Sequence, residues 1–180
     1  GIMLGQLAGA LVTILQNYSN PDSLKMFVVW SFGSLSAVSW TYMKVLFPLV
    51  VLGLLSVIFL LKPLNGLLFG EKYAQSLGFP IQKVRFFVIL LVAVLAGGTT
   101  AFTGPIAFIG MAVPHLARRL TNTSDHRITF PATILCGASL MLLCDIVCQL
   151  PSNGHVLPIN AVSALVGTPI IIWIIIKRKM

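Results

Sequence analysis

Five long stretches with little or no charge dominate the sequence. Four of them contain no charged residue and a fifth contains only Asp145; they cover 1–17, 45–61, 86–114, 156–176 and 128–150. One helical crossing of a membrane needs about 20 predominantly apolar residues. An α-helix also satisfies its own backbone hydrogen bonds inside the hydrocarbon layer. The sequence therefore predicts an all-α, polytopic membrane helix bundle, with residues 1–180 forming a single transmembrane domain.

Composition excludes several other classes. Of the 180 residues, 57% are hydrophobic and 9% are charged, whereas soluble domains carry about 25% charged residues. This balance rules out disordered, collagen-like and disulfide-rich secreted proteins. The three cysteines are Cys136, Cys144 and Cys148. They share one apolar stretch, where a thiol packs as a small hydrophobe.

The positions of Lys and Arg predict the orientation of the chain. A net charge of +8 would favour nucleic acid as the partner of a soluble protein, but in a membrane protein cations gather in cytoplasmic segments. All Lys and Arg except Lys25 and Lys44 lie in 62–85, in 115–127 or in the last four residues. We therefore expect these segments and the carboxy terminus in the cytoplasm, and no nucleic-acid partner.

This orientation requires the stretch 86–114 to cross the membrane and return. Its Gly104-Pro105 pair would interrupt a helix, so we expect a full outward arm followed by a shorter inward arm. If each of the other four stretches crosses once, the chain has about six membrane helices. Segment 18–44 then lies outside, where Asn20-Pro21-Asp22-Ser23 predicts the start of a short surface helix.

The cytoplasmic segment 62–80 is more apolar than an ordinary linker. Gly70 and Gly78 are turn or cap positions, and the segment predicts two short helices broken at Gly70. Two interpretations stay open. The segment is either a loop that joins two spans, or an element that docks into a groove of a soluble cytoplasmic partner.

Few residues offer chemistry. His115, Asp125 and His126 lack the spacing of a metal site, so no metal is expected, and Asp125 is better explained as the cap of the next helix. Asp145 has no second carboxylate in any span, which argues against an intramembrane protease and a proton relay. We expect the thiols of Cys144 and Cys148 to serve only in packing between helices. Because no phosphate-binding loop or Ser/His/Asp set is present, any ATP would be hydrolysed by another chain.

Small residues recur on the first helix. Gly1, Gly5 and Gly9 form a small-xxx-small series, which allows close helix approach. Packing within the chain, a contact between subunits and a pathway lining all remain open. Near the last span, Pro158, Gly167 and Pro169 permit kinks of the kind found in transporters.

Several motifs in order resemble one family. Their residues run from Leu64-Asn65 to Leu68, Gly70-Glu71, Ala74, Ser76-Leu77-Gly78, Thr103-Gly104-Pro105-Ile106, Phe108-Ile109-Gly110, Val113-Pro114-His115, Ala117-Arg118, Ser124-Asp125-His126-Arg127, Asp145-Ile146-Val147, Leu157-Pro158 and Gly167-Thr168-Pro169. The chain thereby resembles the permease family of type II ABC importers. That family includes the vitamin B12 importer permease and the iron-siderophore and haem permeases.

The resemblance implies a transport subunit, not an enzyme. A family member has ten membrane helices, and this chain looks like the end of the fifth through the tenth, without the amino-terminal half. A homodimer in the bacterial inner membrane is implied. Its pathway would be lined largely by 1–17 and 156–176, and the residues expected on this pathway or dimer face are Gly1, Gly5, Gly9, Ala161, Ala164 and Gly167.

The resemblance also implies two protein partners. Segment 62–85 would be the coupling segment that touches an ABC ATP-binding subunit, which holds ATP and Mg, so this chain needs no cofactor. The coupling residues would be Leu64, Asn65, Leu68, Gly70, Glu71, Ala74, Leu77 and Gly78. An extracytoplasmic substrate-binding protein would dock outside, near Gln149 and His155, where some family members carry other docking residues. The implied function is import of a metal chelate; the alternative is an ion-coupled secondary transporter.

Overall fold

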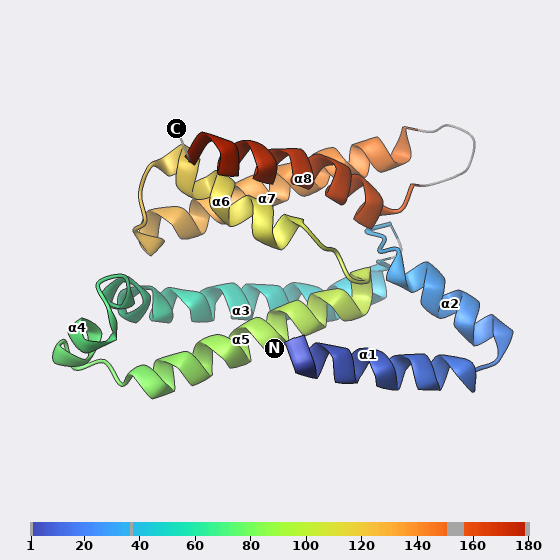
Figure 1. Ribbon diagram of the computed structural model, residues 1–180, viewed down its shortest axis with the longest axis horizontal. Helices are drawn as coiled ribbons and strands as arrows, with labels where there is room; N and C mark the ends of the chain where they lie inside the picture. The colour runs from blue at the N-terminus through green and yellow to red at the C-terminus, as the bar shows by residue number, and fades with distance from the viewer. Residues whose placement is uncertain (1, 37, 151–156, 179–180) are drawn as a thin grey trace.

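The structure, a computed structural model, describes residues 2–36, 38–150 and 157–178 and is helical throughout (Figure 1). Its elements are α1 (Ile2–Asn17), α2 (Pro21–Ser31), α3 (Trp40–Leu67), α4 (Glu71–Ser76), α5 (Ile81–Thr103), α6 (Ile109–Thr121), α7 (His126–Gln149) and α8 (Ile159–Arg178). No strand occurs in the described part of the chain. The all-α class is confirmed.

Three of the described helices are long and apolar enough to cross a membrane: α3 with 28 residues, α5 with 23 and α7 with 24. They correspond to the expected stretches 45–61, 86–114 and 128–150. Helices α1 and α6 are shorter, with 16 and 13 residues. The chain is a polytopic helical protein that combines full-length spans with shorter apolar helices.

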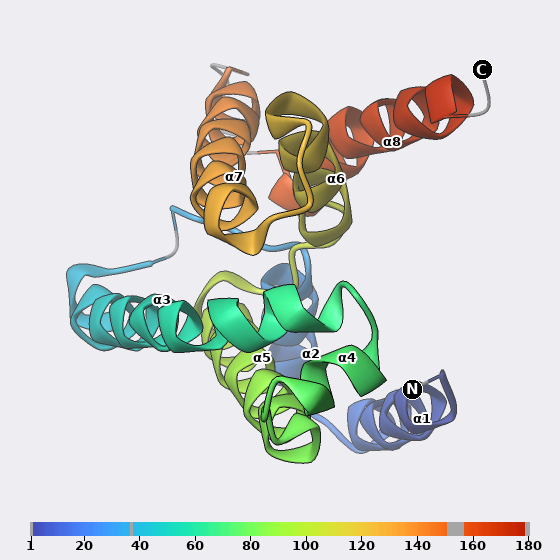
Figure 2. The same ribbon diagram turned by 90° about the vertical axis from the view of Figure 1, so that its left-hand side faces the viewer.

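The helices form two groups (Figures 1 and 2). Helices α6, α7 and α8 pack on one another, and α3 packs on α4 and α5; α3 and α7 make the main helix contact between the groups in the described structure. Helix α1 stands apart, and its side chains from Met3 to Leu15 are exposed. The two groups meet a second time where α2 and the segment after it touch α5 and α8.

The best-buried cluster lies between α7 and α8. Cys144 and Cys148 are buried there with Ile159 and Val162. This confirms that the two cysteines serve packing. Most large apolar side chains elsewhere are exposed, as expected when lipid, not water, surrounds the helices.

Local sequence signals predicted two of the helix boundaries correctly. Helix α5 ends before Gly104 (φ 76°), and α6 begins only after Phe108, whose φ is 63°. The predicted interruption at Gly104-Pro105 is therefore confirmed. The predicted short helix at Asn20-Pro21 is also confirmed, because α2 begins with Pro21 in its first turn.

One local prediction is wrong. Segment 62–80 was expected to form two short helices, but residues 62–67 are the last turns of α3 and only Glu71–Ser76 is a separate helix. Pro63 lies buried inside α3. A proline removes one backbone hydrogen bond and crowds the preceding turn, yet the packed end of α3 accommodates it. The break at Gly70 (φ 107°) occurs as predicted.

The two ends of the molecule differ in charge. The connections from α3 to α5 and from α6 to α7 lie at one end, together with the last turn of α8 (Figure 1). These are the segments 62–85 and 115–127 that carry most of the Lys and Arg. We call this end the basic end. Helix α2, the loop 104–108 and the start of α8 lie at the opposite end.

Candidate functional site

A polar contact joins the two helix groups at the basic end. Asn65, in the last turns of α3, donates from Nδ2 to Asp125 Oδ1 at 2.5 Å. Asn65 Oδ1 accepts from the backbone N–H of His126 at 2.8 Å and lies 2.7 Å from His126 Nδ1. One amide thus uses both of its ends against the start of α7.

Asp125 is the N-cap of α7, as predicted. Its Oδ1 also accepts from the backbone N–H of Arg127 at 2.8 Å. These donors, first the Arg127 N–H and then the Asn65 amide, hold the pKa of Asp125 below its ordinary value despite partial burial. The carboxylate is therefore ionised at neutral pH. It satisfies one free N–H group of the helix start while Asn65 satisfies another.

Helix α4 is held by its neighbours on both sides. Ala74 is fully buried, and a Cβ placed on Gly66 of α3 would lie 3.6 Å from the Ala74 Cβ. Glu71, at the start of α4, pairs with Arg85 in α5. Gly70 and Gly78 bracket the helix with positive φ values of 107° and 83°. The small helix thus sits firmly on the ends of α3 and α5.

An apolar surface surrounds α4 outside the candidate spans. Its residues are Leu68, Phe69, Tyr73 and Leu77, with exposed fractions of 47%, 75%, 49% and 52%. We call this set the α4 surface. A hollow of about 270 Å³ lies between Phe69, Tyr73, Leu77 and the cations Lys62 and Arg127. A second, of about 310 Å³, is lined by Asn65, Leu68, Phe69 and residues 123–125.

The predicted coupling residues fall into two sets. Leu68, Glu71 and Leu77 are exposed, as are the turn glycines Gly70 and Gly78, so a partner could reach them. Leu64 and Asn65 are half-buried and Ala74 is buried. The second set supports the surface from within. Phe69 and Tyr73 were not singled out as coupling residues; their apolar rings outside the spans were the available signal.

The predicted pathway or dimer face is not uniform. Gly5 and Gly9 are exposed, and a Cβ on either would meet no atom within 4 Å. Ala161 is exposed and Ala164 half-buried. Gly167 differs because it is buried, and a Cβ there would lie 3.2 Å from the Phe108 Cβ. Close packing of α8 on the start of α6 accounts for Gly167, whereas Gly1 lies outside the described residues.

The predicted docking corner is only partly visible. Gln149 is exposed and donates from Nε2 to Asp145 Oδ2 at 2.7 Å, one turn earlier in α7. Asp145 thus has a partner on its own helix. His155 lies outside the described residues. In the part of the chain that the structure describes, no group of three or more His, Cys, Asp or Glu residues could hold a metal ion.

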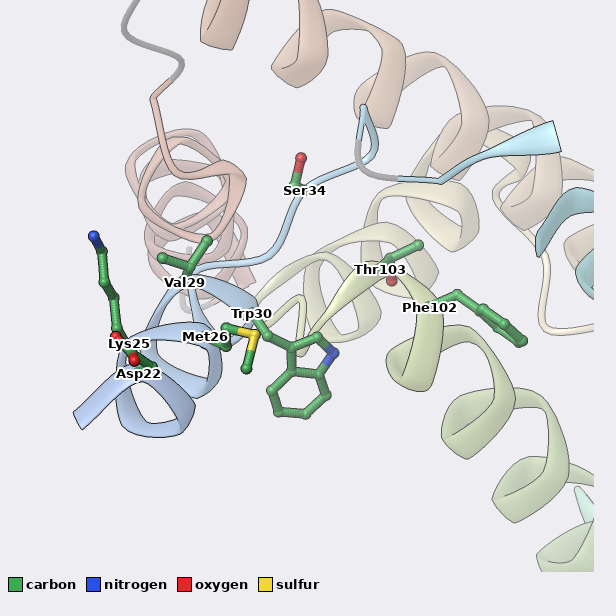
Figure 3. A pocket seen from close by; sticks show the side chains of 8 residues that line it. All are labelled: Asp22, Lys25, Met26, Val29, Trp30, Ser34, Phe102 and Thr103. Atoms are coloured by element: carbon green, nitrogen blue, oxygen red, sulfur yellow. The ribbon is translucent and has the colours of Figure 1, made fainter. Parts of the chain in front are cut away.

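A hollow that sequence reasoning missed lies at the opposite end. It measures about 540 Å³ and lies between α2 and the end of α5 (Figure 3). Asp22 and Lys25 lie on α2, Phe102 lies on α5, and Trp30 projects between them. Trp30 Nε1 donates to the carbonyl of Ala101 at 3.3 Å. Only the packing of α2 on α5 creates the hollow.

Comparison with known proteins identifies one family. The sequence pattern described as the FecCD transport family matches residues 1–177. The vitamin B12 import system permease protein BtuC of Vibrio cholerae serotype O1 is 36% identical over 178 residues, which are 99% of this chain and 53% of that protein. BtuC of Klebsiella pneumoniae is 33% identical over 179 residues, 99% of this chain and 54% of that protein. The chain spans about half the length of these curated relatives.

A solved structure has the same helix arrangement. It is described as an inward-facing conformation of a metal-chelate type ABC transporter. The two structures agree with a TM-score of 0.91 at 33% sequence identity, over 98% of this chain and 58% of that one. The order and packing of the helices described above are therefore those of a known transporter subunit.

Proposed function

Because the chain belongs to the FecCD transport family, we propose that it forms part of the permease subunit of an ATP-driven importer for a metal chelate. The permease is a transport subunit, as its relatives are permease proteins. ATP and Mg bind to a separate ATP-binding subunit, and this chain contributes no cofactor. The protein resides in the bacterial inner membrane with its carboxy terminus in the cytoplasm.

The α4 surface carries this proposal. Its four apolar side chains are exposed at the basic end, on a segment outside the candidate spans. Exposed apolar patches next to water mark sites of protein association. The positive-inside rule assigns the basic end to the cytoplasm, where an ATP-binding subunit would be found. The α4 surface is thus the docking site for that subunit, and the hollows beside Phe69 accept its side chains.

The other partners follow from the opposite end and from α1. A substrate-binding protein docks at the end that holds α2, Gln149 and the start of α8. A second permease subunit packs through the exposed Gly5 and Gly9 face, since small residues allow close helix approach in lipid. The substrate is a chelate such as cobalamin, an iron-siderophore or haem. Of these, cobalamin is favoured by the names of the relatives.

The test reconstitutes the complete importer in lipid vesicles. The permease is combined with its ATP-binding subunit and binding protein, and uptake of cobalamin, a ferric siderophore and haem is measured with ATP or with a non-hydrolysable analogue. We expect uptake of one chelate, only with hydrolysable ATP. Uptake that continues without ATP and without the ATP-binding subunit would instead indicate an ion-coupled secondary transporter.

A matched pair of variants tests the docking site. Leu77→Asp places a charge in the α4 surface, whereas Tyr18→Asp places the same charge at an exposed position in the connection from α1 to α2, which lies at the opposite end (Figure 1). Burial of an unpaired charge at an interface is strongly unfavourable. We expect the ATP-binding subunit to co-purify with Tyr18→Asp but not with Leu77→Asp. Equal co-purification with both variants would contradict docking at the α4 surface.

A further inference from the structure

The contact of Asn65 with Asp125 and His126 lies on the only major helix contact between the two groups in the described structure. Helix α3 belongs to the group that carries α4, and α7 belongs to the group that carries α8. At the basic end, the Asn65 side chain makes three hydrogen bonds between these groups. This residue therefore occupies the position through which a displacement of one group would reach the other.

The path from α4 to Asn65 is short. Ala74, fully buried in α4, lies against Gly66, which directly follows Asn65 in α3. A movement of α4 must therefore displace the last turn of α3. Packed interiors transmit such displacements because they have few voids to absorb them.

The path beyond Asn65 leads to a helix terminus. Asp125 is the N-cap of α7, and His126 is its first residue. A hydrogen bond to the first turn pulls on the helix as a unit, since that turn is tied into the backbone ladder. Helix α7 in turn buries Cys144 and Cys148 against Ile159 and Val162 of α8.

The chemistry of the contact is specific to an amide that faces a carboxylate. Asn65 needs its oxygen for His126 and its NH₂ group for Asp125. The contact with Nδ1 of His126 requires the ring proton on that nitrogen. An aspartate at position 65 would place its carboxylate against that of Asp125. An asparagine at position 125 would keep an oxygen that accepts from Asn65 and Arg127, but without the negative charge.

We propose that Asn65 is a positioning residue that couples α4 to α7, so that motion of the ATP-binding subunit moves the helix group containing α8. This inference rests on the proposed function. It assigns the transmission step to three side chains and the start of one helix. Two rigid groups joined at a few points are a common arrangement for switching between states.

Exchange of the two residues gives a sharp test in the complete reconstituted importer. The variants are Asn65→Asp, Asp125→Asn and the double exchange, with Asn122→Gly as the neighbouring control, at an exposed left-handed residue that takes part in none of the three contacts. In the double exchange, the carboxylate placed at position 65 would accept from His126 and from the amide placed at position 125. Because Oδ1 of Asp125 serves both Arg127 and Asn65, the amide must turn so that its NH₂ group faces position 65 while its oxygen accepts from the Arg127 N–H. The measured quantities are assembly, ATP hydrolysis and chelate taken up per ATP hydrolysed.

We expect Asn65→Asp to lower uptake per ATP by about tenfold or more, because two carboxylates would face each other, and Asp125→Asn to lower it by a smaller factor, because the hydrogen bonds persist without the charge. The double exchange should recover part of the loss seen in Asn65→Asp, and Asn122→Gly should resemble the wild type. Unchanged uptake per ATP in the single variants would overturn the inference. A loss of assembly in both single variants that the double exchange repairs would also overturn it, because the contact would then be needed for folding. If the wild type shows no ATP-dependent uptake, the proposed function itself fails.

Discussion

Gly104 and Trp30 lie so close that no side chain fits at position 104. A Cβ there would overlap the Trp30 carbonyl oxygen and lie 2.9 Å from the Cα of Gly33. The next residue after Gly33, Ser34, donates its backbone N–H to the carbonyl of Thr103 at 2.9 Å. The end of α5 and the segment after α2 are therefore joined by direct backbone contact.

Gly104→Ala should consequently destabilise the protein. The positive φ of 76° adds a conformational cost of roughly 1–3 kcal/mol for a residue with a side chain, and the overlap adds to it. Gly97→Ala is the control, because a Cβ there meets no atom within 4 Å and alanine favours helix. Thermal unfolding in detergent can be followed by the reaction of buried Cys144 and Cys148 with a thiol-reactive dye. Equal midpoints for both variants would contradict the contact.

Helices α3 and α5 interlock through two glycine and leucine pairs. A Cβ at Gly98 would lie 2.7 Å from Leu49 Cδ1, and one at Gly53 would lie 2.8 Å from Leu95 Cγ. We expect Gly98→Val to lower the free energy of unfolding by roughly 1–3 kcal/mol through overpacking. Addition of Leu49→Ala should recover part of this loss in the same unfolding assay. If the double variant is no more stable than Gly98→Val alone, the result would argue against this contact between α3 and α5.

Asp125 should make stability depend on pH. Its folded-state pKa is lowered, first by the N–H of Arg127 and then by the Asn65 amide. A lowered folded-state pKa stabilises the fold at any pH above the unfolded-state value of about 3.9, and this contribution is lost as the pH falls through the folded-state pKa. At neutral pH, the unfolding midpoint of the wild type should therefore be higher than that of Asp125→Ala. The difference should shrink once the pH drops below about 4; a constant difference would contradict this.

Gly167 and Ala161 should respond differently to enlargement. Both were expected on one pathway or dimer face, but Gly167 is buried against Phe108 and Ala161 is exposed. Gly167→Leu should cost roughly 1–3 kcal/mol by forcing α8 away from α6, whereas Ala161→Leu should leave the unfolding midpoint unchanged. If Ala161→Leu lowers uptake in the reconstituted importer without lowering stability, the exposed part of α8 serves the pathway or the dimer contact.

Much of the fold was predictable because its signals are local. The apolar stretches indicated the class, Gly104-Pro105 indicated the break between α5 and α6, and Asn20-Pro21 indicated the start of α2. The helix cap at Asp125 was predictable for the same reason. Residues 62–67 were misplaced because the uncharged stretch ends before Lys62, and only the structure shows that α3 continues through Pro63 to Leu67.

The candidate site was predictable in part. The resemblance identified 62–85 and named Asn65, but it could not say that Asn65 meets a helix start 60 residues away. The hollow around Trp30 was missed because it exists only where α2 packs on α5. Interfacial placement and packing against another helix both suit a tryptophan, so composition could not decide between them.

By itself, the sequence determined that this protein is a bundle of apolar helices with its cations gathered in a few segments, because hydropathy, charge and turn chemistry act over a few neighbouring residues. Only the tertiary structure decided what the small and polar residues do. A glycine suits an open pathway as well as a close helix contact, and an asparagine suits a loop as well as a link between helices. Gly167 packs on Phe108 and Asn65 binds Asp125 because those partners are distant in the chain and meet only when the helices are in place.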